Sequence, residues 1–435
     1  MRAKLKKTVA EEDRPGWATE REIDEARFCR DFAACHPTAY AEGRFFSING
    51  AQTEEQMRKK IYDYLSQYYA TDLHRLVSGL LETMKLELRQ EEFHQRETVI
   101  HVNNGTLRLD TGLSPHKEPC RCRLPVNYDP QAPRPERWLG FLEDLLEPED
   151  IPTLQEFMGY CLVPVNYAQK MLLIVGSGGE GKSRVGVVLS RLLGEGMCNG
   201  SLTKLERDRF ARADLQNRLV MVDDDLQLEA LTTTGNIKTV ITAEQRMDME
   251  RKGIQSYQGT MFCRLMAFGN GNLRSLHDRS HGFFRRQIIL TARPRQPDRV
   301  DDPFLGQLLC RELEGILLWA LEGLERLICS DMRFTVSPRA AANLEDARSE
   351  GNNTLAFLES TGYIRLDPLG EITARHLYSI YTDWCEDNTL IPLSAMSFVR
   401  AVNAESWRYG FTYSNHIPGG TGRQVRGFRG IRAMV

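Results

Sequence analysis

Apolar residues recur along the chain at two kinds of spacing, and together these predict a mixed α/β protein. Spacings of three and four residues predict amphipathic helices between residues 20 and 88, around a short extended piece at 45–48. Short runs typical of strands follow in 99–102 and 106–109. Because the intervening Asn103-Asn104-Gly105 suits a tight turn, these two runs predict a β-hairpin. Helical spacing returns over 136–160.

Short apolar runs come next, at 171–175, 219–222 and 263–268, the last interrupted only by Arg264. Runs of this length, bounded by polar or glycine residues, are typical of parallel strands buried on both faces. A strongly apolar helix is expected over 304–329. Ser337-Pro338 predicts the start of another helix, with serine as its cap and proline as its first residue.

The end of the chain predicts a helix-turn-helix, over 373–387 and 394–404, followed by extended pieces at 409–413 and 425–434 around a glycine-rich tip. This order resembles a winged helix. Proline-rich breaks at 125–135 and 294–303 divide the rest. The expected segments are a helical N-terminal region (1–97), a hairpin and connector (98–150), a core that holds the short apolar strands (151–293), a helical lid (294–351) and a winged-helix-like domain (352–435).

Composition narrows the class of protein. The 435 residues carry a net charge of −3, so any contact with nucleic acid must come from local basic patches. The basic start at 1–7 has no apolar segment behind it, and no apolar stretch reaches membrane-spanning length. Ten scattered cysteines without metal-site spacing favour reduced thiols. We therefore expect a cytoplasmic protein with no membrane partner.

The first candidate site lies between the strand at 171–175 and the helix that follows it. Its eight residues match G-x-x-x-x-G-K-[ST], whose backbone N–H groups cradle nucleotide phosphates. Lys182 is expected at the β- and γ-phosphates, and Ser183 at Mg²⁺. The sequence therefore predicts ATP and Mg²⁺ as ligands. The predicted nucleotide-binding residues are Gly176, Ser177, Gly178, Gly179, Glu180, Gly181, Lys182 and Ser183.

Carboxylates follow the second apolar run. A buried parallel strand that ends in acids delivers them to a nucleotide at its carboxyl edge. We expect Asp223 to hold Mg²⁺ through water and Asp224 to polarise the attacking water.

The third apolar run ends in Gly269-Asn270-Gly271-Asn272. An asparagine here can sense the γ-phosphate, with Asn270 favoured and Asn272 as its rival; an ordinary turn is the alternative. Arg285 and Arg286 follow, and either can be an arginine finger for a neighbouring subunit's site. A solvated surface pair is the alternative.

Basic side chains give two further candidates for DNA contact. Short extended pieces around Lys252-Gly253 predict a hairpin whose tip, with Arg251 and Lys252, could grip phosphates in a ring's channel; an exposed basic turn is the alternative. In the tail, Arg423 and Arg426 lie where no acid occurs after Glu405. A winged helix there could bind DNA or dock a protein.

These motifs fall in one order within residues 176–286, and that order resembles superfamily 3 helicases, a branch of the AAA+ ATPases. More closely, the chain resembles the helicase portion of phage and plasmid primase-helicases, a family related to the poxvirus primase-helicase. The patches outside the ATPase motifs that carry this resemblance are 104–109, 124–130, 154–160, 237–242 and 377–385.

The resemblance implies a hexameric ring that moves 3′ to 5′ on single-stranded and forked DNA in a bacterial host, with a separate primase or replication initiator as a further partner. Two departures matter. The chain has no signature of the family's N-terminal primase domain, so priming is not expected. The polar, proline-containing stretch after the sensor asparagine is replaced by Gly271-Asn272-Leu273.

The function expected is an ATP-dependent DNA helicase acting in replication of a mobile element. The alternative is an AAA+ initiator or loader that remodels an origin or recruits a host helicase without processive unwinding. A non-enzymatic, nucleotide-locked scaffold is a third reading, which the acids and the arginine pair disfavour because a scaffold needs no hydrolysis groups.

Overall fold

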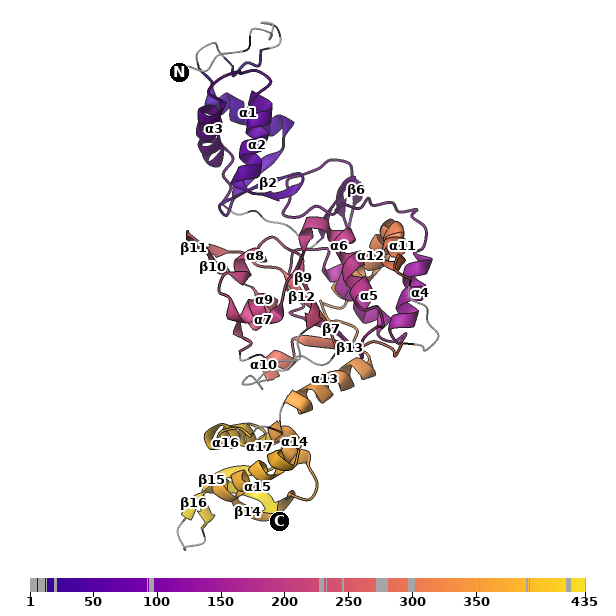
Figure 1. Ribbon diagram of the computed structural model, residues 1–435, viewed down its shortest axis with the longest axis vertical. Helices are drawn as coiled ribbons and strands as arrows, with labels where there is room; N and C mark the ends of the chain where they lie inside the picture. The colour runs from indigo at the N-terminus through magenta and orange to yellow at the C-terminus, as the bar shows by residue number, and fades with distance from the viewer. Residues whose placement is uncertain are drawn as a thin grey trace.

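The computed structural model describes residues 6, 12, 14–18, 22–91, 93, 98–226, 231, 233–244, 246–270, 281–295, 302–351, 353–388, 390, 392–419 and 424–434. Three bodies follow one another along its long axis (Figure 1). We call them the N-terminal body (to residue 93), the central body (98–351) and the C-terminal body (353–434).

The N-terminal body packs three helices against a small sheet. Its elements are α1 (Glu25–Cys35), β1 (Thr38–Ala41), β2 (Arg44–Ser47), β3 (Gly50–Gln52), α2 (Glu54–Leu65) and α3 (Leu73–Glu87). The sequence predicted the helices but only one extended piece where three antiparallel strands occur. Strands of three or four residues are too short to show alternation. Helix α2 begins at a capping box between Thr53 and Gln56.

The predicted hairpin at the start of the central body is confirmed. Strands β4 (Val99–Val102) and β5 (Gly105–Arg108) pair antiparallel, with Val102 opposite Gly105, and β6 (Gly112–Ser114) adds a third strand. Helices α4 (Glu136–Leu145) and α5 (Ile151–Tyr160) follow the connector. All of these share one hydrophobic core with the large sheet behind them.

That large sheet has five strands, all parallel, in the order β13-β7-β12-β9-β8. The three apolar runs of the sequence form β7, β9 and β12, in the middle of the sheet. The strands are β7 (Met171–Val175), β8 (Met197–Asn199), β9 (Val220–Leu226), β12 (Arg264–Gly269) and β13 (Gln287–Thr291).

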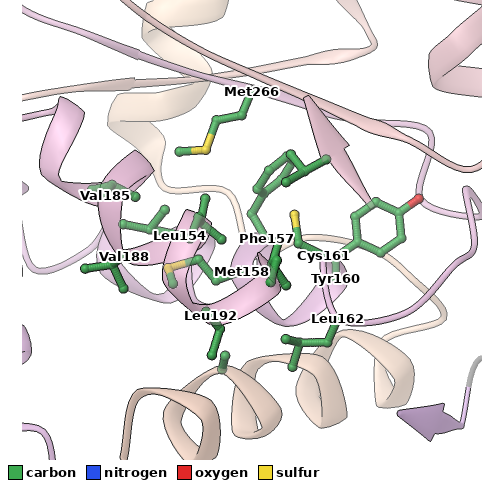
Figure 2. Packing of buried hydrophobic residues seen from close by; sticks show 14 of the residues in the cluster. Leu154, Phe157, Met158, Tyr160, Cys161, Leu162, Val185, Val188, Leu192 and Met266 are labelled. Atoms are coloured by element: carbon green, nitrogen blue, oxygen red, sulfur yellow. The ribbon is translucent and has the colours of Figure 1, made fainter. Parts of the chain in front are cut away.

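Burial on both faces explains the apolar runs within β7, β9 and β12. Along β7, Leu172 and Ile174 belong to one hydrophobic cluster, whereas Met171, Leu173 and Val175 belong to the cluster on the opposite face. Figure 2 shows the first cluster, in which side chains of α5 and α6 gather beneath the sheet. The labelled residues are Leu154, Phe157, Met158, Tyr160, Cys161, Leu162, Val185, Val188, Leu192 and Met266.

Shorter elements cover the sheet. They are α6 (Ser183–Leu193), η2 (Gly194–Gly196), α7 (Leu202–Arg207), α8 (Ala211–Asp214), α9 (Gly235–Thr242) and α10 (His281–Phe284). The predicted basic hairpin is also confirmed, as β10 (Met247–Arg251) paired with β11 (Ile254–Gly259). Its turn places Gly253 at φ +76°, a backbone conformation that favours glycine.

The single helix predicted over 304–329 is divided into α11 (Leu305–Leu309), η3 (Cys310–Glu312) and α12 (Leu313–Cys329). Helix α12 packs closely on α5: a Cβ on Gly159 would lie 2.3 Å from the Ala320 carbonyl oxygen. Helix α13 (Pro338–Gly351) begins as predicted, since the Ser337 hydroxyl accepts the Ala340 N–H at 2.9 Å.

The C-terminal body has its own core and a three-stranded antiparallel sheet in the order β14-β16-β15. Its elements are α14 (Asn353–Glu359), β14 (Ile364–Thr373), α15 (Ala374–Asp387), α16 (Ala395–Ala404), α17 (Ser406–Tyr409), β15 (Thr412–Pro418) and β16 (Gln424–Ala433). The two predicted helices and the extended piece predicted at 425–434 are confirmed. Of the piece predicted at 409–413, only 412–413 lies in a strand, because 406–409 form α17. Strand β14 was not predicted.

Two general expectations can be compared with the structure. No helix among the described residues is both long enough and apolar enough to cross a membrane. All ten cysteines are free thiols, and six of them are buried: Cys29, Cys120, Cys122, Cys161, Cys263 and Cys385.

Candidate anion-binding cavity at the carboxyl edge of the sheet

The glycine loop joins β7 to α6 at the carboxyl edge of the parallel sheet. Gly178, Gly179 and Gly181 adopt φ values of +108°, +84° and +99°, which residues other than glycine rarely adopt. Helix α6 begins directly after the loop, at Ser183. The loop therefore presents backbone N–H groups beside the positive end of a helix, an arrangement suited to an anion.

A carboxylate of the protein itself already lies against these donors. Glu180 Oε1 accepts the N–H groups of Ser177 at 2.5 Å and Gly178 at 2.8 Å. Glu180 Oε2 accepts a hydrogen bond from Lys182 Nζ at 2.7 Å. Burial would raise the pKa of Glu180, but Lys182 and the loop N–H groups outweigh this effect and lower it. The loop therefore stabilises a negative charge.

Asn270, at the end of β12, faces the same loop. Strand β12 lies between β7 and the acidic strand β9, so its last residues reach the space between the loop and the acids. Asn270 Oδ1 is 3.5 Å from Lys182 Nζ, and a Cβ on Gly178 would lie 3.9 Å from the Asn270 amide. The rival Asn272 lies outside the described residues.

The three consecutive aspartates of β9 face different ways. Asp223 is buried, and its Oδ2 accepts the Leu202 N–H at the start of α7, at 2.8 Å. Burial raises the pKa of Asp223. Asp224 and Asp225 are exposed and line the cavity beside the loop. The structure thus brings Asp224 to the loop as expected, and adds Asp225, but directs Asp223 toward α7.

The cavity formed by these groups has a volume of about 1120 Å³. On one side it is lined by the loop, the two exposed aspartates, Phe268 and Asn270. On the other side it is lined by α4 and the start of α11. The lining residues there are Arg137, Phe141, Asp144, Asp302, Pro303, Leu305 and Leu308.

Sequence reasoning missed this second side. Arg137, Phe141 and Asp144 lie more than thirty residues before the loop, and the spacing of α4 shows only an amphipathic helix. Arg295 was also missed: a Cβ on Gly179 would lie 3.6 Å from Arg295 Nη1. An arginine four residues beyond the end of β13 could have been found, because parallel strands end at the same edge.

Arg285 and Arg286 lie at the opposite edge of the sheet. The Met171 N–H, at the amino end of β7, donates to the Arg286 carbonyl oxygen at 2.8 Å. The five residues of β7 separate this edge from the loop by about 13–16 Å. Arg285 is exposed, whereas the Arg286 guanidinium donates to the Gly282 carbonyl. Neither arginine contributes to the cavity of its own chain.

The two basic hairpin residues differ in their contacts. Arg251 Nη2 donates to Gln216 Oε1 at 3.1 Å, and its guanidinium lies over the Tyr257 ring. The exposed Lys252 is at the turn itself. Of these two residues, therefore, only Lys252 projects from the tip without a hydrogen bond or ring contact to another described residue.

In the C-terminal body, Arg426 is exposed and lines a hollow of about 590 Å³ between α15, α16 and the sheet. Arg375 and Arg400 line the same hollow, and no acidic residue does. Arg423 lies outside the described residues. The structure therefore gathers Arg426 with two arginines that the sequence did not single out.

Comparison with known proteins gives two family matches, each to part of the chain. Residues 4–147 match the family model described as "D5 N terminal like", and residues 174–286 match a family of unknown function, DUF5906. These matches support a relationship to the phage primase-helicase proteins that the sequence resembles. The second begins two residues before Gly176 and ends at Arg286, and so spans the candidate motifs from loop to arginine pair. No curated protein matches the chain.

Solved structures extend the comparison. An A-form apo structure of the NrS-1 C-terminal region (305–718) is 12% identical, with a TM-score of 0.51, and the match covers 93% of this chain and 99% of that one. The chain shares the fold of the NrS-1 C-terminal region. A second apo structure of that region is 10% identical with a TM-score of 0.49, over the same shares of the two chains.

Proposed function

We propose that this protein is an ATP-dependent DNA helicase, a ring-forming single-stranded DNA translocase in the replication of a phage, plasmid or other mobile element in the bacterial cytoplasm. The observation that carries the proposal is the loop at the carboxyl edge of the sheet. There Lys182 and two backbone N–H groups hold an anion, and Asn270, Asp224 and Asp225 face the same cavity. The central body is proposed to be an AAA+ core of superfamily 3.

The donors present fit a nucleoside triphosphate. The loop N–H groups and Lys182 suit its phosphates, as their contact with a carboxylate indicates, and the far side of the cavity offers Phe141 and Leu308 to a base. Ser183, with Asp224 or Asp225, provides the oxygen ligands that Mg²⁺ takes beside phosphates. Bound there, Mg²⁺ would neutralise charge on the phosphates.

The remaining groups have separate roles in this proposal. Asp224 polarises the attacking water, and Asn270 orients it at the γ-phosphate. Since Arg285 and Arg286 cannot reach their own cavity, they would act on a neighbouring subunit's, which requires an oligomer; we propose a hexamer. Lys252 at the hairpin tip would hold DNA phosphates in the channel, with movement from 3′ to 5′.

The C-terminal body is proposed to be a winged helix that contacts DNA. Its order of helix, strand, three helices (the last only four residues long) and two strands supports this assignment, and Arg375, Arg400 and Arg426 provide positive charge beside α16. The same features suit the alternative, an initiator or loader that binds an origin and recruits a host helicase or primase.

The test is strand release from a forked, labelled duplex with Mg²⁺ and ATP, beside a Lys182→Ala control. Strand release by the wild-type protein alone would support the helicase. ATP hydrolysis without strand release would favour the initiator or loader, and absence of ATP binding in the wild type would contradict both.

A further inference from the structure

The donors of the phosphate loop are occupied by a side chain of the loop itself. Glu180 joins Ser177 N–H, Gly178 N–H and Lys182 Nζ through its two carboxylate oxygens, at 2.5, 2.8 and 2.7 Å. These are the groups that the motif uses to hold nucleotide phosphates. Glu180 therefore contacts the same donors that would bind the phosphates.

Packing shows that this carboxylate is enclosed. Glu180 is 2% exposed and Lys182 is 7% exposed. A Cβ on Gly176 would lie 2.7 Å from Glu180 Oε1 and 2.9 Å from Lys182 Nζ, so the carboxylate and the ammonium fill the space left by the glycine. A side chain that only decorated the loop would leave this space open to solvent.

A phosphate and this carboxylate cannot share the same donors. Both are anionic, each needs the same N–H groups, and Lys182 offers one ammonium to both. We propose that Glu180 is a built-in competitor for the phosphate site, which nucleotide must displace before it can bind. This inference rests on the proposed ATP binding and adds a residue that sets its affinity.

Displacement has a measurable consequence for affinity. When only a fraction of the molecules has an open site, the apparent dissociation constant rises by the inverse of that fraction. Charge-assisted hydrogen bonds are strong enough to keep roughly nine in ten or more of the loops closed. We therefore expect Glu180→Gln to lower the Kd for Mg-ATP and Mg-ADP by about 10-fold or more. AMP, which lacks the phosphates that Lys182 meets, should bind no more tightly.

The opposite role predicts the opposite sign. If Glu180 instead orders the loop and positions Lys182 for phosphate, Glu180→Gln weakens binding of ATP and ADP. Simple loss of negative charge would strengthen binding of every anion, including AMP. Glu180→Asp distinguishes the effect of the negative charge from that of the contact with the loop, because it keeps the carboxylate but shortens the side chain by one carbon. Occupancy of the loop predicts tighter ATP binding for this variant too, whereas a charge effect predicts no change.

The experiment measures Kd by calorimetry for ATP, ADP and AMP with the full chain, its Glu180→Gln and Glu180→Asp variants and a Glu143→Gln control. Glu143 is an exposed acid of α4 that is not among the residues lining the cavity. Melting temperatures without nucleotide verify that each variant folds. Hydrogen exchange of the loop amides gives a second readout: the wild type without nucleotide should protect Ser177 and Gly178, and Glu180→Asp should lose that protection.

The outcomes are distinguishable. Tighter ATP and ADP binding in both variants, with little change for Glu143→Gln, supports the competitor role. If the wild type binds ATP and neither Glu180 variant binds it more tightly, the competitor role is overturned and the proposed function stands. If neither the wild type nor any variant binds ATP, the proposed function fails and this inference fails with it.

Discussion

At the scale of single residues, Asp223, Asp224 and Asp225 are adjacent in the chain but have different surroundings. Asp223 accepts the Leu202 N–H, while the other two face the cavity. Successive side chains of a strand point to opposite faces, and the pairing of β9 with β12 shifts register after Ala267. The order of acids in the sequence therefore does not assign their roles.

We expect Asp224→Asn to lower kcat for ATP hydrolysis by about 100-fold or more, because a general base is lost. Asp223→Asn should keep hydrolysis within roughly threefold, because an amide oxygen can still accept the Leu202 N–H, whereas Asp223→Ala should cost about 1 kcal/mol of stability through loss of that acceptor. Steady-state ATPase assays and urea unfolding measure these effects. Loss of hydrolysis in a fully stable Asp223→Asn protein would restore Asp223 as the metal ligand.

At the scale of elements, two neighbouring residues of the β10–β11 hairpin have different roles. Arg251 anchors the hairpin to the central body, whereas Lys252 is exposed at its tip. Arg251 is bonded to Gln216, and Tyr257 OH donates to the same oxygen at 2.6 Å. Gln216 follows α8 and so fixes the base of the hairpin to the central body. Lys252 lies beyond these contacts, next to Gly253.

Lys252→Ala is expected to leave ATP hydrolysis within about twofold and to reduce strand separation at least about tenfold, because the phosphate contact at the hairpin tip is lost. Lys204→Ala, an exposed lysine of α7, is the matched control and should unwind normally. Gel-based unwinding and a coupled ATPase assay give both values. Normal unwinding by Lys252→Ala would show that the hairpin assignment is wrong.

Some elements could be predicted from local sequence patterns and others could not. The β4–β5 turn and the start of α13 were predictable, since Asn-Gly and Ser-Pro act on their immediate neighbours. The three strands of the N-terminal body and β14 were not found. Each forms a strand because another strand lies beside it, and β14 pairs with residues some sixty positions later in β16.

At the scale of the whole molecule, the sheet separates the loop from the arginine pair. Arg285 and Arg286 lie at its amino edge, where burial and these two arginines lower the pKa of Lys170. A catalytic arginine in this place can serve only another molecule. The proposed oligomer is therefore a requirement of the geometry if either arginine takes part in hydrolysis.

Mixing two inactive variants tests this requirement. Arg285→Ala should bind ATP normally yet hydrolyse it about 10³-fold more slowly, and Lys182→Ala should not bind it. In mixed assemblies, an intact loop meets an intact arginine at some interfaces, so hydrolysis should partly return. Arg311→Ala, an exposed arginine of η3, is the control. Mass photometry verifies that mixed oligomers form. If they form and ATP hydrolysis recovers at no mixing ratio, action of Arg285 in trans is ruled out.

The sequence by itself determined the strands β7, β9 and β12, the glycine loop and the hairpin tip. Each depends on local rules: burial on both faces makes a strand continuously apolar, and positive φ requires glycine. Tertiary structure decided which groups share the cavity. Strand order put Asn270 over Gly178, packing brought α4 opposite the loop, and the fold of eight residues turned Glu180 onto the donors of its own motif. The first two join positions far apart in the chain, which no local spacing relates. The Glu180 contacts span only two or three residues, but they depend on the backbone conformation of the folded loop.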